Sequence, residues 1–337
     1  MERDLAPLAS LLPAAELTYN EYAPVWGWDI SLVRRLHRAG YKDLPTAEQL
    51  AEIRRLSSRL TAVELLPAIR RRLPEGSTVG ESWTGQTPSG RGANHSPGGE
   101  FIVKADYSGS GRGVRVVHGS RFMVQGSWFM VHGSRGSTHP LPASGTPPSL
   151  GGETKGFVIE PYYDKVVDFA LEFVCSAEEV RFLGISLFET NGRNAYVGNC
   201  IAPQQVLWQR ISKYVPRFDF EQLINVVREE LALRFVGHYL GPLGVDMMIV
   251  GDNVHPCVEV NVRRTMGELS LHMLPLLAEG VEGFCRIVFD KDSASLHHTV
   301  AAMPPAVCDD KGRLVSGTKL LTPLTADTHY VALIETT

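Results

Sequence analysis

Two apolar segments on either side of a tight turn, residues 245–250 and 257–262, constrain the fold more than any other part of the sequence. The turn, GDN at 251–253, consists of residue types that reverse the chain between antiparallel strands. In the second segment, CVEVNV, the strand period of two puts Glu259 and Asn261 on one face and valines on the other. The pattern predicts an antiparallel sheet with one buried apolar face and one polar face.

Further strands are predicted throughout the second half of the chain. Residues 168–174 alternate between apolar and polar, and residues 182–189 and 195–202 flank an Asn-Gly turn. The first third of the chain is helical in pattern, with a capping box at Thr46 and Gln49 and a second one at Thr61 and Glu64. The predicted fold class is α+β with antiparallel sheets.

Composition excludes several classes of protein. With 44% hydrophobic residues among 337, the chain can form a core, and a net charge of -4 gives no basic footprint for nucleic acid. No apolar run approaches the roughly 20 residues that span a bilayer, and the start carries charges of both signs, unlike a signal peptide. We therefore expect a cytoplasmic protein without a membrane or nucleic-acid partner. Five dispersed cysteines without a C-x-x-C pair favour neither a zinc site nor disulfides. The oligomeric state is left open.

One region of the chain is predicted to be an insertion. Residues 117–137 repeat the units VHGSRFM, VQGSWFM and VHGSRGS, and a stretch rich in Pro, Ser and Gly follows to residue 152. The Gly-Ser pair in each unit and the lack of a leucine seam argue against a coiled coil. Residues 117–152 are therefore interpreted as a surface insertion without a chemical role.

Three groups of residues could carry chemistry. The first is Lys104 at the end of a strand, followed by the glycine-rich run SGSGRG at 108–113. Glycines let backbone amides approach phosphate oxygens, and a nearby cation neutralises them. A strand followed by a flexible turn is an equally good reading of this segment alone.

The second group is EPYY at 160–163 followed by Asp168. A strand that stops at a proline exposes backbone groups that could read an adenine ring, and a nearby carboxylate could hold ribose hydroxyls. An ordinary strand turn with solvated acids would look the same.

The third group is the most specific. Antiparallel register brings Asp246 on the first strand of the hairpin close to Asn261 on the second, and Glu259 lies on the same face as Asn261. Carboxylate and amide oxygens suit Mg²⁺, and Arg263 follows directly, where it could meet an anion. The alternative is a solvated sheet face.

Taken in order, these segments resemble the ATP-grasp superfamily, and its bacterial members in particular. The residues that carry the resemblance are FIVKADYSGSGRGV at 101–114, FVIEPYYDKVVDFALEF at 157–173, and LGVDMMIV with HPCVEVNVRRTMG at 243–267. The resemblance implies two α+β lobes that grip ATP. It divides the chain into a reduced N-terminal region at 1–45, a lid lobe at 46–155, a catalytic lobe at 156–290 and a strand extension at 291–337.

The resemblance also implies a role for each residue. Lys104 would touch the ATP phosphates. Glu160 and Tyr162 would read adenine, and Asp168 the ribose. Arg59 would replace a missing lysine of the nucleotide lobe. The loop that closes over the phosphates would comprise Ser108, Gly109, Ser110, Gly111, Arg112 and Gly113.

In the same resemblance, Asp246, Glu259 and Asn261 would hold Mg²⁺, or Mn²⁺ in its place, and Arg263 would face the transferring phosphoryl group. The implied activity is ATP-dependent ligation of a small-molecule carboxylate to an amine through an acyl phosphate, with Arg263 and Lys104 catalytic. Two alternatives stay open: an ATP-binding module without catalysis, and a kinase-like transfer. The substrates are not indicated by any motif.

Overall fold

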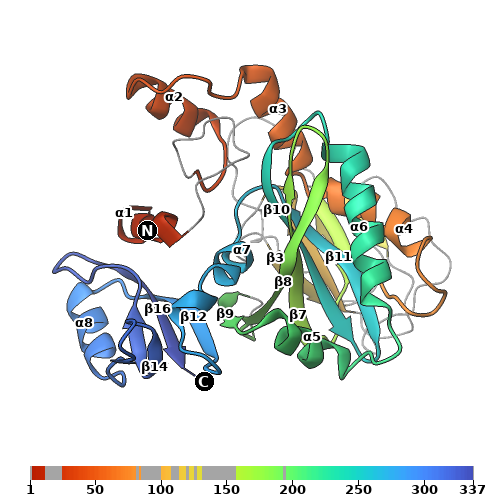
Figure 1. The fold of residues 1–337 in the computed structure, drawn as a ribbon. Helices are drawn as coiled ribbons and strands as arrows, with labels where there is room; N and C mark the ends of the chain where they lie inside the picture. Colours follow the sequence, from red (N-terminus) through yellow and green to blue (C-terminus); the bar gives the residue numbers. More distant parts are fainter. Residues whose placement is uncertain are drawn as a thin grey trace.

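The fold is that of a computed structural model, which describes residues 2–11, 25–80, 83–84, 100–107, 114–118, 121–124, 127–130, 157–192 and 195–336. Two antiparallel sheets organise the chain (Figure 1). The smaller sheet has the order β1-β6-β2-β3, formed by Trp83–Thr84, Phe157–Pro161, Glu100–Ala105 and Val114–His118. The predicted class, α+β with antiparallel sheets, is confirmed.

The larger sheet has eight strands in the order β11-β10-β7-β8-β9-β12-β16-β15. In chain order these are β7 (Val167–Cys175), β8 (Val180–Thr190), β9 (Tyr196–Ile201), β10 (Gly241–Val250), β11 (Asn253–Asn261), β12 (Gly283–Phe289), β15 (Thr318–Leu320) and β16 (Tyr330–Thr336). The predicted hairpin is β10 and β11, which pair on either side of the turn at Gly251. Gly251 has φ +60°, a conformation that favours glycine.

The helices of the described chain are α1 (Glu2–Leu5), α2 (Ile30–Arg38), α3 (Ala47–Leu56), α4 (Leu60–Arg70), α5 (Gln204–Ser212), α6 (Phe220–Phe235), α7 (Met266–Leu271) and α8 (Ser293–Ala301), with 3-10 turns at Ala6–Leu11 and Leu274–Leu276. The capping box of Thr46 and Gln49 is present at the start of α3. The second predicted box, at Thr61 and Glu64, is wrong. Helix α4 begins at Leu60, so Thr61 already lies inside it, and its hydroxyl donates to the carbonyl of Leu56 over 2.9 Å.

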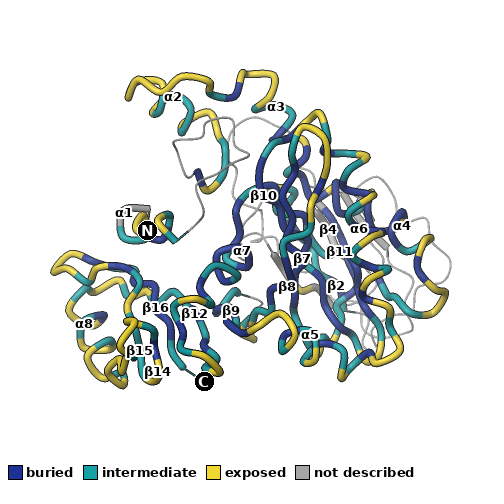
Figure 2. Tube along the Cα trace, viewed as in Figure 1, coloured by how far each residue is buried: buried dark blue, intermediate teal, exposed yellow. Residues whose placement is uncertain are grey.

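The main core lies between one face of the larger sheet and helices α3, α4 and α6 (Figure 2). Phe169, Leu171 and Phe173 point into it from β7, as the alternation in this segment predicts. Leu56 of α3 and Leu65 of α4 are buried in the same cluster. The helices that precede the smaller sheet in the sequence therefore pack on the larger sheet, which leaves the opposite face of that sheet to polar residues.

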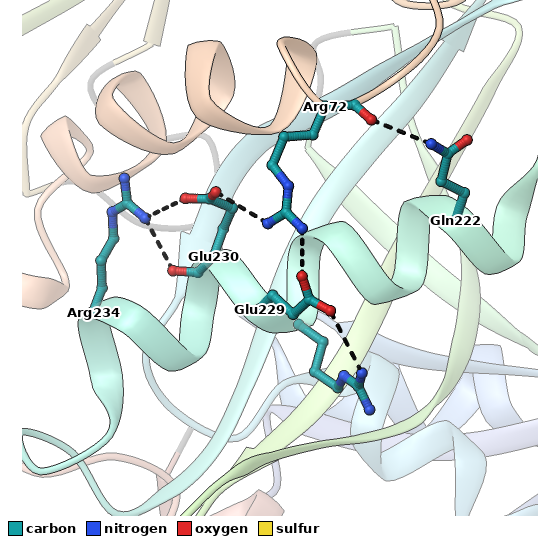
Figure 3. Close-up of polar contacts among 6 residues, drawn as sticks. Arg72, Gln222, Glu229, Glu230 and Arg234 are labelled. Carbon is teal, nitrogen blue, oxygen red and sulfur yellow. Dashed lines mark hydrogen bonds and ion pairs between the residues drawn. The ribbon is translucent and has the colours of Figure 1, made fainter.

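A network of charges joins the end of α4 to α6 (Figure 3). We call it the α4–α6 seam, formed by Arg72, Gln222, Glu229, Glu230 and Arg234. Arg72 forms ion pairs with Glu229 and Glu230, and its carbonyl accepts from the Gln222 amide over 3.2 Å. Arg234 pairs with Glu230 over 2.7 Å. Arg72 thus ties the residues that follow α4 to a neighbouring helix.

Strand pairing crosses two of the predicted domain boundaries. β6 pairs with β2 across residue 155, and β16 pairs with β12 across residue 290. The domain division itself stays a prediction. A second core joins these C-terminal strands to the start of the chain, with Leu8 beside Leu269 and Ile334.

Two short strands lie within the repeat, β4 (Arg121–Val124) and β5 (Ser127–Met130), and they pair with each other. β13 (Val307–Cys308) and β14 (Leu314–Ser316) form a second small pair. Most of the predicted insertion at 117–152 lies outside the described residues. In the described part of the chain, no helix is long and apolar enough to cross a bilayer.

Candidate functional site

The second face of the larger sheet carries a cluster of polar residues opposite the core. Asp246 on β10 is the cross-strand partner of Glu259 on β11 and of Ala170 on β7. One row further along, Gly244 is the partner of Asn261 and of Glu172. Directly paired residues point to the same face. We call this set the polar face, formed by Asp168, Glu172, Asp246, Glu259 and Asn261.

A string of hydrogen bonds connects three of the residues predicted from the hairpin. The amide nitrogen of Asn261 donates to Asp246 Oδ2 over 3.0 Å, and Asn261 Oδ1 accepts from Arg263 Nη2 over 2.9 Å. Arg263 also donates to the carbonyl of Arg264 over 3.0 Å. Asn261 therefore orients both a carboxylate and the guanidinium that follows it.

Arg59 reaches the same place from the first helical region. It is the N-cap residue of α4, and its Nη1 pairs with Glu259 Oε2 over 2.8 Å. Its Nε donates to the carbonyl of Ala105, just after Lys104 on β2, over 3.0 Å. Arg59 thus links α4, the end of β2 and the hairpin. Arg59 lies between two helices and not inside one, because α3 ends at Leu56 and α4 begins at Leu60.

Lys104 and Glu160 form a buried ion pair in the smaller sheet. Lys104 lies opposite Val158, and Glu160 lies opposite Ile102, so both side chains are on one face of β2 and β6. Their charged atoms are 2.5 Å apart, and each side chain is only 9% exposed. The two residues predicted to meet phosphate and adenine are thus side by side, and each neutralises the other.

The remaining predicted nucleotide residues are already bonded within the chain. Asp168 Oδ2 accepts from Lys165 Nζ over 2.5 Å and from Thr190 Oγ1 over 2.9 Å. The backbone amide of Tyr162 donates to the carbonyl of Glu100 over 2.9 Å. The glycine-rich loop at 108–113 lies outside the described residues, so its predicted closure over phosphates stays a prediction.

Burial sets unusual acidities on the polar face. Burial, together with the charge of Glu259, raises the pKa of Asp246 to about 7. Burial also raises the pKa of Glu172 to about 8, although the hydroxyls of Thr265 and Ser186 each bond its carboxyl group over 2.8 Å. At pH 7 the carboxyl group of Glu172, with a pKa of about 8, therefore mostly holds its proton.

Glu172 is the residue that sequence reasoning missed. The alternation of β7 places it on the face of Asp168, but no motif singles it out. The structure puts it beside two glycines: a Cβ on Gly267 would lie 1.9 Å from Glu172 Oε1, and one on Gly244 would lie 2.7 Å from Oε2. Gly244 lies opposite Glu172 in the sheet, and Gly267 reaches it from α7. No local sequence pattern indicates that these two glycines flank a strand glutamate.

His255 on β11 is a second buried group that no motif indicated. Neither ring nitrogen has a hydrogen-bond partner within the described chain, and Tyr163 meets the ring edge-on at 5.5 Å between centroids. Burial, with the charges of Lys104 and Arg70, lowers the pKa of His255 to about 3, so the imidazole is neutral. The ring of His255 therefore adds no charge near Lys104.

The donor set of the hairpin fits a hard divalent cation. Asp246, Glu259 and Asn261 offer two carboxylates and an amide oxygen, which are the ligand types of Mg²⁺. In this structure the guanidinium of Arg59 stands beside Glu259 as a positive charge. Within the described ranges no three His, Cys, Asp or Glu side chains gather as a metal site, so phosphate or water oxygens would have to complete the shell.

One hollow in the described surface shares no residue with this site. It has a volume of about 540 Å³ and lies along α2 and the segment that follows, lined by residues from Val33 to Pro45. Its walls carry Arg34, Arg38 and Lys42 but none of the predicted site residues.

Comparisons with known proteins give similarity of fold alone. No model of a protein family matches the sequence, and no curated protein matches it. Among solved structures, the chain is similar to carboxyaminoimidazole ribonucleotide synthase from Aspergillus clavatus in complex with ATP. That likeness has 12% identity and a TM-score of 0.47 and covers 86% of this chain and 70% of the other.

Two further structures are similar at the same level. For N5-carboxyaminoimidazole synthetase from Staphylococcus aureus in complex with ADP, the identity is 13% and the TM-score 0.43, over 84% of this chain and 68% of the other. For an ATP-grasp superfamily protein from Archaeoglobus fulgidus, the values are 12% and 0.42, over 91% and 71%. All three likenesses are distant, with identities of 12–13% and TM-scores of 0.42–0.47. Residue roles are argued below from this chain alone.

Proposed function

We propose that this chain is an ATP-grasp enzyme that joins a small-molecule carboxylate to an amine, with ATP consumed and ADP formed. The observation that carries the proposal is the hydrogen-bonded string Asp246–Asn261–Arg263. A carboxylate, an amide oxygen and a guanidinium are held in a fixed order on one sheet face, with Glu259 and Arg59 beside them. Such an order suits a metal-bound polyphosphate with a cation at its far end.

The residues divide into two roles. Asp246, Glu259 and Asn261 would hold Mg²⁺, which would neutralise charge on the phosphate oxygens when bound. Lys104, at the end of β2, would contact phosphates already present in ATP, and Glu160, Tyr162, Asp168 and Arg59 would bind the rest of the nucleotide. Arg263 would face the phosphoryl group as it moves. The loop from Ser108 to Gly113 would cover the phosphates.

The chemistry requires a leaving group, because a carboxylate is a poor electrophile. An oxygen of the substrate carboxylate attacks the γ-phosphorus, the bond from that phosphorus to its bridging oxygen breaks, and ADP leaves. The amine nitrogen then attacks the acyl carbon, inorganic phosphate leaves with the former carboxylate oxygen, and the proton of the amine passes to solvent. Arg263 would stabilise the charge that accumulates on the phosphoryl oxygens in the first of these steps.

The test is a screen for ADP release over carboxylates with and without amines. ADP that requires both substrates supports a ligase, and trapping with hydroxylamine should give a hydroxamate from the acyl phosphate. ATP binding without any release would support the non-catalytic alternative. A stable phosphorylated acceptor that hydroxylamine does not trap would support kinase-like transfer.

Matched variants within the hairpin make the screen specific. Asp246→Asn and Glu259→Gln should abolish release, because each removes a negative charge from the proposed metal site. Asp252→Asn makes the same chemical change in the exposed turn of the same hairpin and should leave release unchanged. Equal effects of the three substitutions would contradict the assignment of the metal ligands.

A further inference from the structure

Residues 263–265, which follow β11, leave the sheet, and contacts hold them from several sides. Arg263, Arg264 and Thr265 connect the end of β11 to α7, which packs against β8 and β9 (Figure 1). From the sheet side, Thr265 Oγ1 donates to Glu172 Oε2 over 2.8 Å. From the helix side, the buried guanidinium of Arg264 pairs with Glu268 over 2.6 Å. These two contacts hold Arg264 and Thr265, but they do not involve Arg263, the first residue of the connection.

A third contact comes from a distant part of the sequence. The backbone amide of Arg264 donates to the carbonyl of Trp26 over 2.8 Å. Gly27, the next residue, lies so close that a Cβ built on it would be 3.1 Å from Arg263 Cβ and 3.8 Å from its Cδ. That distance leaves no room for a larger residue unless Arg263 moves. The segment at residues 25–29 therefore touches the side chain that the proposed reaction needs most.

The segment is anchored on both sides of this contact. Val25 is buried, and Trp28 packs against the main core. Asp29 accepts from the amide of Leu32 over 2.8 Å and so begins α2. Because the segment is fixed at Val25, Trp28 and Asp29, it can keep the carbonyl of Trp26 in one position. A mobile segment could not.

We propose that residues 25–29 hold the turn at 263–265 and that Gly27 is a positioning residue for Arg263. The catalytic consequence rests on the proposed function; the docking itself does not. Asn261 then fixes the guanidinium of Arg263, Gly27 confines its stem, and Trp26 holds the backbone amide of the next residue, Arg264. The region before α2, which carries no catalytic motif, would thus orient the guanidinium of Arg263 toward the phosphoryl group.

The test uses the full chain with Gly27→Val, and with Gly27→Ala as a milder variant in case the first does not fold. Gly192→Val is the control, because a Cβ at that glycine meets nothing within 4 Å. Hydrogen exchange of the Arg264 amide measures docking without any substrate. Exchange should become at least about tenfold faster in the Gly27 variants and stay unchanged in Gly192→Val. Unchanged exchange in all variants would overturn the proposal.

Turnover then separates positioning from mere packing. In Gly27→Val the turnover number for ADP release should fall roughly 10- to 100-fold, while ATP affinity and the KM values change less than about threefold. Faster exchange together with an unchanged turnover number would overturn the positioning role. If the wild-type chain releases no ADP with any substrate pair, the proposed function fails, and the exchange result alone decides whether residues 25–29 hold the turn.

Discussion

Carboxylates lie close to one another in two regions of the molecule, the α4–α6 seam and the polar face of the larger sheet. At the seam, burial raises the pKa of Glu230, but hydrogen bonds and charges from Arg234 and Arg72 outweigh it, and the pKa lies below its ordinary value. On the polar face, burial and neighbouring carboxylates prevail, and the pKa of Glu172 and of Asp246 rises. The seam is thus electrostatically complete, and the polar face is not.

The difference separates a structural network from a candidate site. In the seam, Arg72 pairs with Glu229 and Glu230, and Arg234 pairs with Glu230 (Figure 3). Arg228 also approaches Glu229, at 3.9 Å. On the polar face, the partners of Glu172 among the described residues are two hydroxyls, and that of Asp246 is an amide. A sheet face that gathers acids without enough cations is destabilised unless a ligand supplies positive charge. Substitutions in both regions and one deletion test this contrast.

Removal of Lys104 should have the largest effect. Lys104→Ala leaves Glu160 buried and unpaired, which should destabilise the chain by roughly 3–5 kcal/mol and also weaken ATP binding. Adding Glu160→Gln should restore most of the thermal stability without restoring ATP affinity. Thermal unfolding and nucleotide titration of both variants measure the two effects. Recovery of ATP affinity in the double variant would mean that Lys104 serves the fold alone.

Removal of the Arg263 guanidinium should affect turnover in particular. Arg263→Ala should keep ATP affinity within a few-fold and lower substrate-dependent ADP release by about a hundredfold or more, the scale of one lost charge-stabilising donor. Arg234→Ala in the seam removes the same group from a structural pair and should leave release unchanged. Unaltered release in Arg263→Ala would make this arginine structural and favour the non-catalytic alternative.

The pH dependence of stability should distinguish Glu172 from ordinary acids. Its folded-state pKa of about 8 lies above the unfolded value of about 4.5, so the folded state holds a proton that the unfolded state has lost between these values. This contribution is fully present below pH 4.5 and falls as pH rises toward 8. Relative to Glu172→Gln, the wild-type chain should lose roughly 2 kcal/mol between pH 5 and 7. Parallel stability curves would show that Glu172 ionises normally.

The seam should respond in the opposite direction and more weakly. Glu230 has a lowered pKa, so its contribution is present above pH 4.5 and is lost as pH falls through the folded-state value. Glu230→Gln should destabilise the chain by about 1 kcal/mol or less at pH 7, because Arg72 and Arg234 are partly exposed. The difference between the two chains should vanish under acidic conditions. A loss that persists at pH 3 would indicate packing and not charge.

The repeat insertion should matter least. Replacing residues 119–152 with a short Gly/Ser linker keeps β3 and removes β4 and β5, which pair only with each other among the described strands. Because long loops cost little once their ends are fixed, unfolding temperature and ATP affinity should stay close to the wild-type values. Insoluble protein after this deletion would mean that the insertion packs on the body.

Much of the fold follows from local sequence patterns. The hairpin of β10 and β11, the alternation in β7 and the capping box at Thr46 are local, and the structure contains all three. The second capping box is wrong because the start of α4 depends on the Arg59 backbone, whose amide bonds Asp106 far along the chain. A local window cannot contain that partner.

The candidate site divides in the same way. Asp246, Glu259, Asn261 and Arg263 belong to one hairpin, so spacing alone brings them together. Gly244 meets Glu172 through sheet register, and Gly267 meets it through the packing of α7 on the sheet. Residues 26–27 meet Arg263 and Arg264 through tertiary docking. No motif encodes these contacts, since each depends on where separate elements pack.

The space around Glu172 has a consequence for the comparison of related sequences. Its carboxyl group fills the volume in which side chains at positions 244 and 267 would begin. The three positions therefore share one volume, and a larger residue at 244 or 267 needs the carboxyl group of residue 172 to give way. In an alignment of relatives, residues 172, 244 and 267 should covary: wherever a larger residue replaces either glycine, the strand glutamate should be replaced by a shorter side chain.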